Sequence, residues 1–312
     1  MNKVSHKHSR SRGTQSVTVQ DLVARGARRL TRARVFFGHG TDNAWDESAA
    51  LVWHALKLPT PSARIYARTT TLRQQGLARE LITRRIRERM PAVYLTGTTW
   101  FAGLKFKTDA RALIPRSPLA ELIERGYAPW ADARRVRRVL DIGTGSGCIA
   151  IATARMLPKA RVDALDVCAQ ALGLAAENVR HHRLGRRVRL LESDYFGALN
   201  DERYDIIVSN PPYVGAREMR SLPAEYRHEP RMALAAGKDG MDAVRVILKD
   251  AGRHLNPGGI LIVEVGNTEA AVRRAFAHLP FTWLTFERGG GGVFMLTAEQ
   301  LGSQGPGSQG LS

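Results

Sequence analysis

The spacing of apolar and polar positions changes along the chain and divides it into regions. From about residue 17 to 90, apolar residues recur every three or four positions, which predicts helices whose aromatic side chains form a core. The expected stripes are Leu22, Val23, Ala27 and Leu30, then Trp45, Ala49, Val52, Trp53 and Leu56, then Leu77, Leu81 and Ile86. Asp42 or Asn43 can cap the second helix, and two prolines follow it. The pattern predicts a small helical domain.

Runs of branched and aromatic residues follow and predict strands. Residues 94–114 are typical of a hairpin that turns near Gly103. A helix is expected from about Leu119. Further strands are expected at 139–142, 161–166, 188–194, 204–210 and 260–265, with helices at 241–255 and 268–278, and a closing hairpin at 281–286 and 293–296. Strands that alternate with helices predict a doubly wound α/β sheet.

A glycine turn follows the first of these strands. Gly143, Gly145 and Gly147 are spaced G-x-G-x-G, where a dinucleotide fingerprint would read G-x-G-x-x-G. Glycines at this position let the backbone approach a ligand at the carboxyl ends of the strands. Asp141 lies two positions before the first glycine. A carboxylate there would repel a diphosphate but would favour the ammonium and sulfonium charges of S-adenosylmethionine.

Acidic residues end the next two strands, a pattern that fits that cofactor. Asp166 lies where a ribose-binding acid is expected in such folds. Asp194 could accept from the adenine amine, and Tyr195 could pack on the base. Each of these acids could instead cap a helix or end a strand. Their order along the chain carries more weight than any one of them.

The fourth strand ends in Asn210, Pro211, Pro212 and Tyr213. Prolines cannot donate to a sheet ladder, so the strand must stop near Asn210. The carboxamide offers an acceptor and two donors, the carbonyls beside the prolines can accept, and the tyrosine supplies a flat face. These groups suit a planar NH₂ group. A motif of this length can also simply end a strand and begin a turn.

The charge is unevenly distributed. Residues 1–138 hold 27 Lys and Arg against 10 Asp and Glu, whereas residues 139–312 hold 20 against 19. A basic region beside a neutral one suggests that the front half meets a polyanion, such as RNA or an RNA-containing particle. An arginine-rich face that is merely solvated is the alternative.

Composition limits the compartment and the chemistry. Hydrophobic content of 44% indicates a soluble globular protein, and no apolar run reaches the roughly 18 residues of a membrane span. Cys148 and Cys168 are the only cysteines, and the start of the chain shows no apolar stretch typical of a secretory signal, so a reducing cytoplasm is expected. Both cysteines are expected to be small buried hydrophobes, and no metal site is predicted.

Taken together, these motifs resemble those of a known family. Asn210-Pro-Pro-Tyr213 is similar to the motif of methyltransferases that modify a planar nitrogen, and the chain between its two ends resembles the HemK/PrmB family of N(5)-glutamine methyltransferases. The family's release-factor members carry Ile-Pro-Arg-Pro-[Asp/Glu]-Thr, whereas this chain carries Ile114-Pro-Arg-Ser-Pro118. With Glu229-Pro-Arg-Met-Ala-Leu234, that version resembles the branch that modifies ribosomal protein L-three.

The resemblance implies a class I methyltransferase, that is, a Rossmann-like doubly wound sheet with a small N-terminal helical domain and a β-hairpin linker. The expected parts are a basic tail (1–16), a helical substrate-recognition domain (17–92), the hairpin linker (93–118), the catalytic domain (119–300) and a flexible tail (301–312). Residues 215–239 are expected to form a lid or substrate loop.

The expected S-adenosylmethionine site consists of Asp141, Gly143, Thr144, Gly145, Gly147, Asp166, Asp194, Tyr195 and Asn210. The expected glutamine site consists of Asn210, Pro211, Pro212 and Tyr213. The substrate would be ribosomal protein L-three, either free or within an RNA-containing ribosomal precursor. Three other functions fit the motifs: a release-factor glutamine methyltransferase, an rRNA or DNA exocyclic-amine methyltransferase, and a noncatalytic module that binds ribonucleoprotein.

Overall fold

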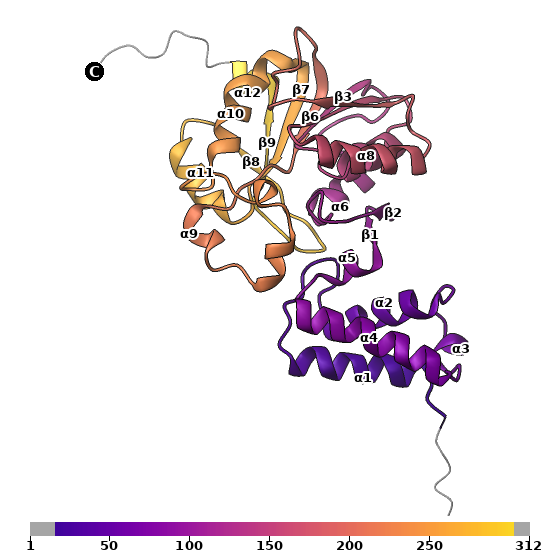
Figure 1. Cartoon of the computed structure of the whole chain (residues 1–312). Helices are drawn as coiled ribbons and strands as arrows, with labels where there is room; N and C mark the ends of the chain where they lie inside the picture. The colour runs from indigo at the N-terminus through magenta and orange to yellow at the C-terminus, as the bar shows by residue number, and fades with distance from the viewer. Residues whose placement is uncertain (1–15, 303–312) are drawn as a thin grey trace, which may run out of the picture. The chain divides into compact units, whose positions relative to one another are not determined.

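The computed structural model describes residues 16–302, which form two compact units (Figure 1). One unit holds residues 16–37 and 41–89, and the other holds residues 38–40 and 90–302. The two expected tails lie almost entirely outside the described residues. Within residues 16–302, no helix combines the length and the apolar character needed to cross a membrane.

The first unit consists of helices. They are α1 (Val19–Arg32), α2 (Ala44–Leu56), α3 (Ala63–Tyr66) and α4 (Leu72–Glu88). The side chains of Thr18, Asn43 and Thr71 each accept a hydrogen bond from the backbone N–H three residues later, which satisfies a free donor at the start of α1, α2 and α4. The predicted helical domain and the cap at Asn43 are confirmed.

The predicted buried faces of α2 and α4 are wrong in detail. Trp45 is 40% exposed and Leu77 is 43% exposed, whereas Glu47 and Arg85 are fully buried. Arg85 Nε donates to Glu47 Oε1 at 2.7 Å. Val52 is buried as predicted. Because the ion pair places two charged residues inside the unit, the apolar spacing alone identifies only part of the buried face of each helix. The expectation that the aromatic residues form the core therefore fails for Trp45.

The second unit opens with α5 (Ala92–Thr96) and a hairpin of β1 (Thr98–Phe101) and β2 (Leu104–Lys107). The turn residues Ala102 and Gly103 have φ values of +45° and +71°. Positive φ at both central residues matches the twist of a two-residue hairpin. The predicted hairpin and its turn at Gly103 are confirmed, but it spans 98–107 and not 94–114, because residues 94–96 belong to α5.

The rest of the second unit is built on a seven-stranded sheet with the order β5-β4-β3-β6-β7-β9-β8. The strands are β3 (Arg138–Ile142), β4 (Arg161–Asp166), β5 (Val188–Glu192), β6 (Tyr204–Ser209), β7 (Leu255–Glu264), β8 (Thr282–Trp283) and β9 (Val293–Thr297). The helices are α6 (Leu119–Glu124), α7 (Cys148–Met156), α8 (Ala169–His181), α9 (Ala216–Met219), α10 (Asp242–Asp250), α11 (Glu269–Ala275) and α12 (Ala298–Gly302). Strands β3 to β7 pair in parallel, and β9 pairs antiparallel with β7 and β8. The predicted doubly wound sheet is confirmed.

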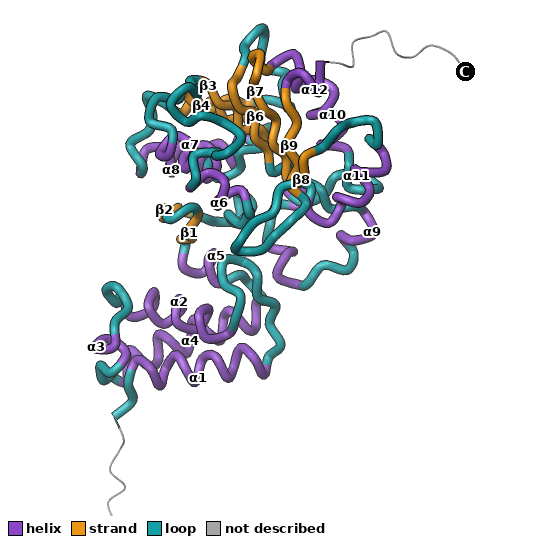
Figure 2. The backbone as a smooth tube through the Cα atoms, turned by 180° about the vertical axis from the view of Figure 1, so that it is seen from behind, coloured by secondary structure: helices purple, strands orange, loops and turns teal. Residues whose placement is uncertain are grey.

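Both faces of the sheet are covered, so its central strands are apolar on both sides. Val139 and Ile206 lie in register and belong to a core that includes α6 and α7. The next residues, Leu140 and Ile207, belong to a core that includes α10 and α11. Figure 2 shows α7 and α8 on one side of the strands and α10 and α11 on the other. Continuous burial explains why these strands read as apolar runs.

Several strand boundaries differ from the prediction, and β8 is only Thr282–Trp283 where 281–286 was expected. Two of the differences have a local cause. β7 begins at Leu255, so the predicted turn at 256–259 lies inside the strand, at the point where its register against β6 shifts. β5 ends at Glu192, two residues early. Ser193 Oγ accepts from Ala198 N at 3.0 Å and donates to the Tyr195 carbonyl oxygen at 2.8 Å, which folds the chain into a turn. Side-chain bonds of this kind compete with a sheet ladder.

Candidate active site

A cavity of about 360 Å³ lies at the carboxyl ends of β3, β4 and β6. The strand order changes direction at β3, and ligands of doubly wound sheets bind at such a switch point. The predicted site residues that line the cavity are Gly143, Thr144, Gly145, Asp166, Asp194, Tyr195, Asn210, Pro211 and Pro212. The structure therefore brings most of the predicted set together. Asp141, Gly147 and Tyr213 do not line it.

The glycine turn presents backbone atoms to the cavity. Gly143 and Gly145 have φ values of +70° and +54°, which residues with a Cβ adopt only under strain. Thr144 N donates to the carbonyl oxygen of Leu165 at 2.8 Å, and Gly145 N donates to Asp166 Oδ2 at 2.8 Å. These two bonds hold the turn against the end of β4.

Two predicted cofactor residues lie behind this turn. Asp141 is fully buried, and its Oδ2 accepts from Thr144 Oγ1 at 2.6 Å and from Ala150 N at 3.1 Å. Burial raises the pKa of this carboxyl to about 7. Its Oδ1 atom has no hydrogen-bond partner among the described residues. Gly147 begins α7, and a Cβ there would lie 3.2 Å from Ala175 Cβ of α8, so this residue governs helix packing.

Two acids reach the cavity from the ends of β4 and β5. Asp166 Oδ1 accepts from Cys168 N at 2.9 Å, and with the bond from Gly145 this fixes the carboxylate. Each oxygen keeps a lone pair for a ligand. Burial raises the pKa of Asp166. Asp194 is exposed, and the half-buried Tyr195 next to it has a φ of +47°.

Asn210 and Pro211 offer unused hydrogen-bonding groups. They follow β6, whose last residue Ser209 donates from Oγ to the carbonyl oxygen of Ile142 at 2.7 Å and so fixes the strand end beside β3. Within residues 16–302, the Asn210 carboxamide makes no hydrogen bond and the Pro211 carbonyl accepts none from the backbone. In a half-buried position these groups need a partner from a ligand or water.

Tyr213 is fixed from two sides. Its hydroxyl donates to Glu264 Oε1 at 3.2 Å. A Cβ at Gly266 would lie 2.6 Å from the tyrosine ring, and a Cβ at Gly292 would lie 2.2 Å from the Gly266 carbonyl oxygen. Tyr213, Gly266 and Gly292 are thus stacked on one another, and neither glycine position has room for a side chain. Burial raises the pKa of Tyr213.

Glu264 is a site residue that the sequence analysis missed. It is 4% exposed at the end of β7, and its Oε2 accepts from Ser117 Oγ at 2.5 Å. Burial outweighs the hydrogen bonds from Ser117 and Tyr213 and raises the pKa of Glu264 to about 7. Ser117 itself lines the cavity. The available signal was an acid at the end of an otherwise apolar strand.

A second missed network surrounds Glu229. Arg116 donates from its two terminal nitrogens to the two oxygens of Glu229, at 2.6 and 2.7 Å. Ile114 N donates to Oε1 at 3.0 Å, and His39 Nε2 lies 3.4 Å from Oε2. Burial alone would raise the pKa of Glu229, but the bonds from His39 and Arg116 outweigh it and lower the value to about 2. The network fixes residues 114–116 at the cavity wall.

The segment expected to be a lid or substrate loop, 215–239, contributes to the same wall. It contains α9 and two short 3₁₀ helices, η1 (Ala224–His228) and η2 (Arg231–Ala233). Pro230, Met232 and Ala233 line the cavity, and Met232 is 51% exposed. The segment therefore presents apolar side chains to whatever enters from solvent.

Known proteins are similar to this chain in sequence. Residues 129–225 match the family model described as the methyltransferase small domain. The ribosomal protein uL3 glutamine methyltransferase of Xylella fastidiosa is 47% identical over 285 residues, covering 91% of each chain. Its namesake from Xanthomonas campestris is also 47% identical, covering 91% of this chain and 92% of the other, and that from Bordetella pertussis is 46% identical, covering 91% and 96%. This chain belongs to the family of ribosomal protein uL3 glutamine methyltransferases.

Solved structures support the fold. The crystal structure of the hMettl16 catalytic domain in complex with MAT2A 3′UTR hairpin 6 aligns with a TM-score of 0.50 at 18% identity. The alignment covers 79% of this chain and 91% of the other. At this identity the likeness concerns the fold alone, which is that of the class I methyltransferases.

Membership in the family makes this chain a methyltransferase that uses S-adenosylmethionine, and the noncatalytic interpretation is set aside. The cavity fits that cofactor. Its volume lies within the usual range for small-molecule sites, and its wall combines apolar side chains such as Ile142 and Val167 with Asp166 and Asp194. Carboxylates accept from hydroxyl and amine groups, and the unpaired Oδ1 of Asp141 leaves a further buried polar atom behind the glycine turn.

Proposed function

We propose that this protein transfers a methyl group from S-adenosylmethionine to the side-chain amide nitrogen of a glutamine in ribosomal protein uL3. The named relatives support the substrate. The observation that carries the proposal is the Asn210 carboxamide, which lines the cavity with neither its oxygen nor its nitrogen bonded to a described residue. That group complements an amide better than a hydroxyl or a thiol.

The cofactor-binding roles follow from the positions of the lining residues. Asp166 would accept from the ribose hydroxyls, Asp194 from the adenine amine, and Tyr195 would pack on the base. When bound, S-adenosylmethionine supplies an electrophilic methyl group on its sulfonium. Asp141 is assigned a different role from the expected direct contact. It holds Thr144 and Ala150 in place, so it positions the turn that lines the cavity.

The substrate roles fall to the residues after β6. Asn210 Oδ1 and the Pro211 carbonyl oxygen would accept the two N–H hydrogens of the glutamine amide, while Pro212 would flank its plane. The Tyr213 ring does not line the cavity, so the direct contact expected of it is replaced by a supporting role behind the motif. An amide nitrogen has a delocalised lone pair, so alignment of this nitrogen is the main task of the protein. No strong base is needed before transfer, because the proton can leave afterwards.

The first test is Asn210→Ala. We expect kcat to fall by about 10²- to 10³-fold, the range seen when one positioning hydrogen bond is removed from an active site. The dissociation constant for S-adenosylmethionine, measured by calorimetry, should stay within about twofold, because the donor site keeps its acids and its glycine turn. Asn200→Ala, at an exposed position, is the matched control and should retain full turnover. Normal turnover in Asn210→Ala would refute the proposed clamp.

The substrate is tested by offering labelled S-adenosylmethionine with purified uL3, release factor and ribosomal RNA in parallel. Label on a glutamine amide of uL3 is expected, and Asn210→Ala should abolish it. Label only on release factor would move the assignment to the other protein substrate. Label only on RNA would replace the glutamine with an exocyclic amine and keep the clamp.

The cellular context is part of the proposal. We infer that uL3 is modified either free or within an RNA-containing ribosomal precursor, because residues 1–138 carry most of the excess positive charge. The helical unit is proposed to recognise the substrate. The two free cysteines, one buried and one partly buried, agree with a cytoplasmic location.

A further inference from the structure

The β1–β2 hairpin exposes an aromatic side chain beside a lysine. Trp100 is 67% exposed, and its cross-strand partner in the hairpin register is Lys105. Phe101 and Phe106 point to the opposite, buried face. Directly opposed residues on one face of a hairpin lie within contact range. An indole this open presents a flat aromatic face on which a ligand ring can stack.

The hairpin is anchored on α8. The Lys105 carbonyl oxygen lies 3.0 Å from His182 Nε2, which directly follows α8, and Lys107 N donates to Asn178 Oδ1 at 2.8 Å. The Phe106 and His182 rings also pack, with centroids 4.9 Å apart. Figures 1 and 2 both show the hairpin beside α8. The outward face of the hairpin therefore continues into the end of α8.

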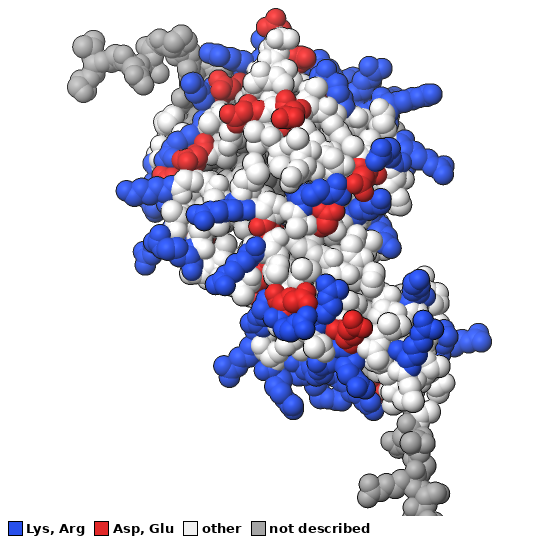
Figure 3. Space-filling model, viewed as in Figure 1, with Lys and Arg blue, Asp and Glu red and all other residues white. Residues whose placement is uncertain are grey.

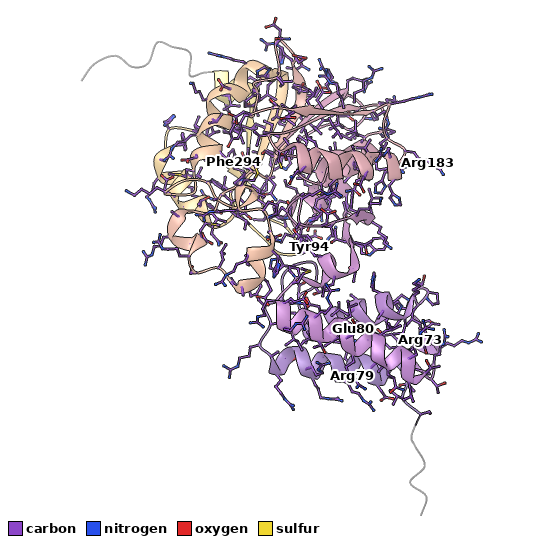
Figure 4. All side chains as sticks on the ribbon, viewed as in Figure 1. Arg73, Arg79, Glu80, Tyr94, Arg183 and Phe294 are labelled. Carbon is purple, nitrogen blue, oxygen red and sulfur yellow. The ribbon has the colours of Figure 1, made fainter. Side chains whose placement is uncertain are left out.

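The end of α8 is rich in arginine. A shallow hollow of about 590 Å³ is lined by Arg180, Arg183, Leu184, Gly185, Arg186 and Arg187. Figure 4 shows Arg183 at the end of α8, and Figure 3 shows Lys and Arg side chains projecting on this side of the unit. Arg180, Arg183 and Arg186 are exposed and form no ion pair within residues 16–302. Arg187 differs, because it donates to the carbonyl oxygens of Ala154 and Leu157 at 2.5 and 3.2 Å and holds the turn.

The nearest acid on α8 does not neutralise these cations. Glu177 is 3.2 Å from Lys107 Nζ and 2.9 Å from Arg111, so its charge is already balanced by two cations. The nearly even count of acidic and basic residues in 139–312 does not reveal this arrangement, because it takes no account of where the charges lie. The surface defined by Trp100, Lys105, Arg180, Arg183 and Arg186 is a concentrated cationic face with one open aromatic ring.

We propose that this surface binds single-stranded RNA. Uncompensated arginines attract phosphates, and an exposed indole stacks on unpaired bases; this combination characterises proteins that bind single strands. An acidic protein segment would satisfy the arginines but not the indole. The proposal deepens the proposed function, since it supplies a contact for RNA on the catalytic unit itself, separate from the basic residues of the helical unit.

The test uses the full-length protein and a labelled single-stranded RNA of about 12 nucleotides, followed by fluorescence anisotropy at several salt concentrations. Trp100→Ala should weaken binding about tenfold, the loss expected for one stacked base, with an unchanged salt slope. The triple variant Arg180→Gln, Arg183→Gln, Arg186→Gln should reduce the slope of log K against log salt by about 2, as expected for three lost phosphate contacts. A merely structural defect would not separate these two readouts.

The matched control is Lys249→Gln, Arg253→Gln, Arg274→Gln, which removes the same charge from exposed positions on other elements of the same unit. Trp100→Phe should keep most of the affinity. If the control weakens RNA binding as much as the triple variant, or if neither test variant changes it, the proposal is wrong. If the triple arginine variant loses binding to polyglutamate but binds RNA as tightly as the wild type, the surface binds an acidic protein instead.

Failure of this proposal can be told apart from failure of the proposed function. Methyl transfer to isolated uL3 should be normal in Trp100→Ala and in the triple arginine variant, because none of these residues lines the cavity. If no variant and no wild-type protein methylates uL3, the proposed function is wrong whatever RNA does. If transfer is normal and RNA binding is unaltered, only the RNA surface is wrong.

Discussion

Glu229 and Glu264 anchor the same cavity-wall segment, at residues 114–117, but in opposite ways. Glu229 is bound by Arg116 and His39, and its pKa is lowered to about 2. Glu264 is bound by the hydroxyls of Ser117 and Tyr213, and its pKa is raised to about 7. The two carboxyls are equally buried, at 5% and 4% exposure. Their difference shows that the partner, rather than burial, decides whether an acid stays charged inside this fold.

The difference in pKa between the two carboxyls also distinguishes two structural roles of a buried acid. A permanently charged pair such as Arg116–Glu229 fixes a loop at every physiological pH, but breaking it leaves a buried charge. An acid held by hydroxyls costs less to disturb, and its hydrogen bonds reorganise when it takes up a proton. The cavity wall therefore contains one rigid anchor and one that responds to pH.

Breaking the charged anchor should have the largest effect. Glu229→Ala leaves the Arg116 guanidinium largely buried without a partner and should lower the free energy of unfolding by about 3 kcal/mol, the lower end of the range for such pairs because Arg116 is 25% exposed. Urea unfolding measures it. Glu47→Ala, which removes the other buried Arg–Glu pair, should cost at least as much, since Arg85 is fully buried. Glu88→Ala, at a surface pair, is the control with no measurable change.

The pH response of the second anchor should be intermediate in size. A folded pKa of about 7 against an ordinary 4.5 means that Glu264 adds stability below pH 4.5, which is lost as pH rises to about 7. The contribution is at most about 3 kcal/mol. Asp141 acts in the same direction, with a folded pKa of about 7 against 3.8. Glu229 acts oppositely: its contribution is present above pH 4.5 and is lost as pH falls towards 2.

Glu264→Gln isolates this response. Urea unfolding at pH 5, 6, 7 and 8 should show a shallower decline in the variant than in the wild type, with the remainder due to Asp141. Parallel curves for the two proteins would mean that Glu264 titrates normally and that the contrast with Glu229 is not real.

Ser117→Ala should give the smallest effect. It removes the 2.5 Å hydrogen bond to Glu264 and should cost about 1 kcal/mol, more at pH 8 than at pH 5, because a hydroxyl stabilises the ionised carboxylate more than the neutral acid. The same urea series measures it. The control is Ser221→Ala, whose hydroxyl bonds only the Glu218 carbonyl oxygen at an exposed position. Equal losses at both pH values would show that Ser117 does not act through the charge on Glu264.

Local sequence patterns predicted most of the fold because its main signals are local. A glycine turn after 139–142 and prolines after 204–209 limit the strands wherever the rest of the chain goes. The helical unit was harder. Glu47 and Arg85 bury each other, and spacing rules count both as solvent-facing, so the predicted stripes on α2 and α4 match the buried faces only in part.

The site residues also divide into those that local sequence patterns predict and those that they do not. Residues at strand ends, such as Asp166 and Asn210, were predicted because parallel strands end at one edge. Ser117 and Glu264 lie 147 positions apart in the chain, and Arg116 and Glu229 lie 113 apart, so no local pattern links them. Asp141 shows the opposite limit: the motif marked it as important, but only the structure shows that it faces the turn and not the cavity.

The stack of Tyr213, Gly266 and Gly292 has a consequence for how sequences of this family should be compared. Neither glycine bears a reactive group or lines the cavity, yet neither has room for a methyl group. A map of tolerated substitutions would therefore mark the positions after β7 and before β9 as though they belonged to the catalytic motif. Invariance at those two glycines would reflect the limited space beneath the Tyr213 ring and not a catalytic role.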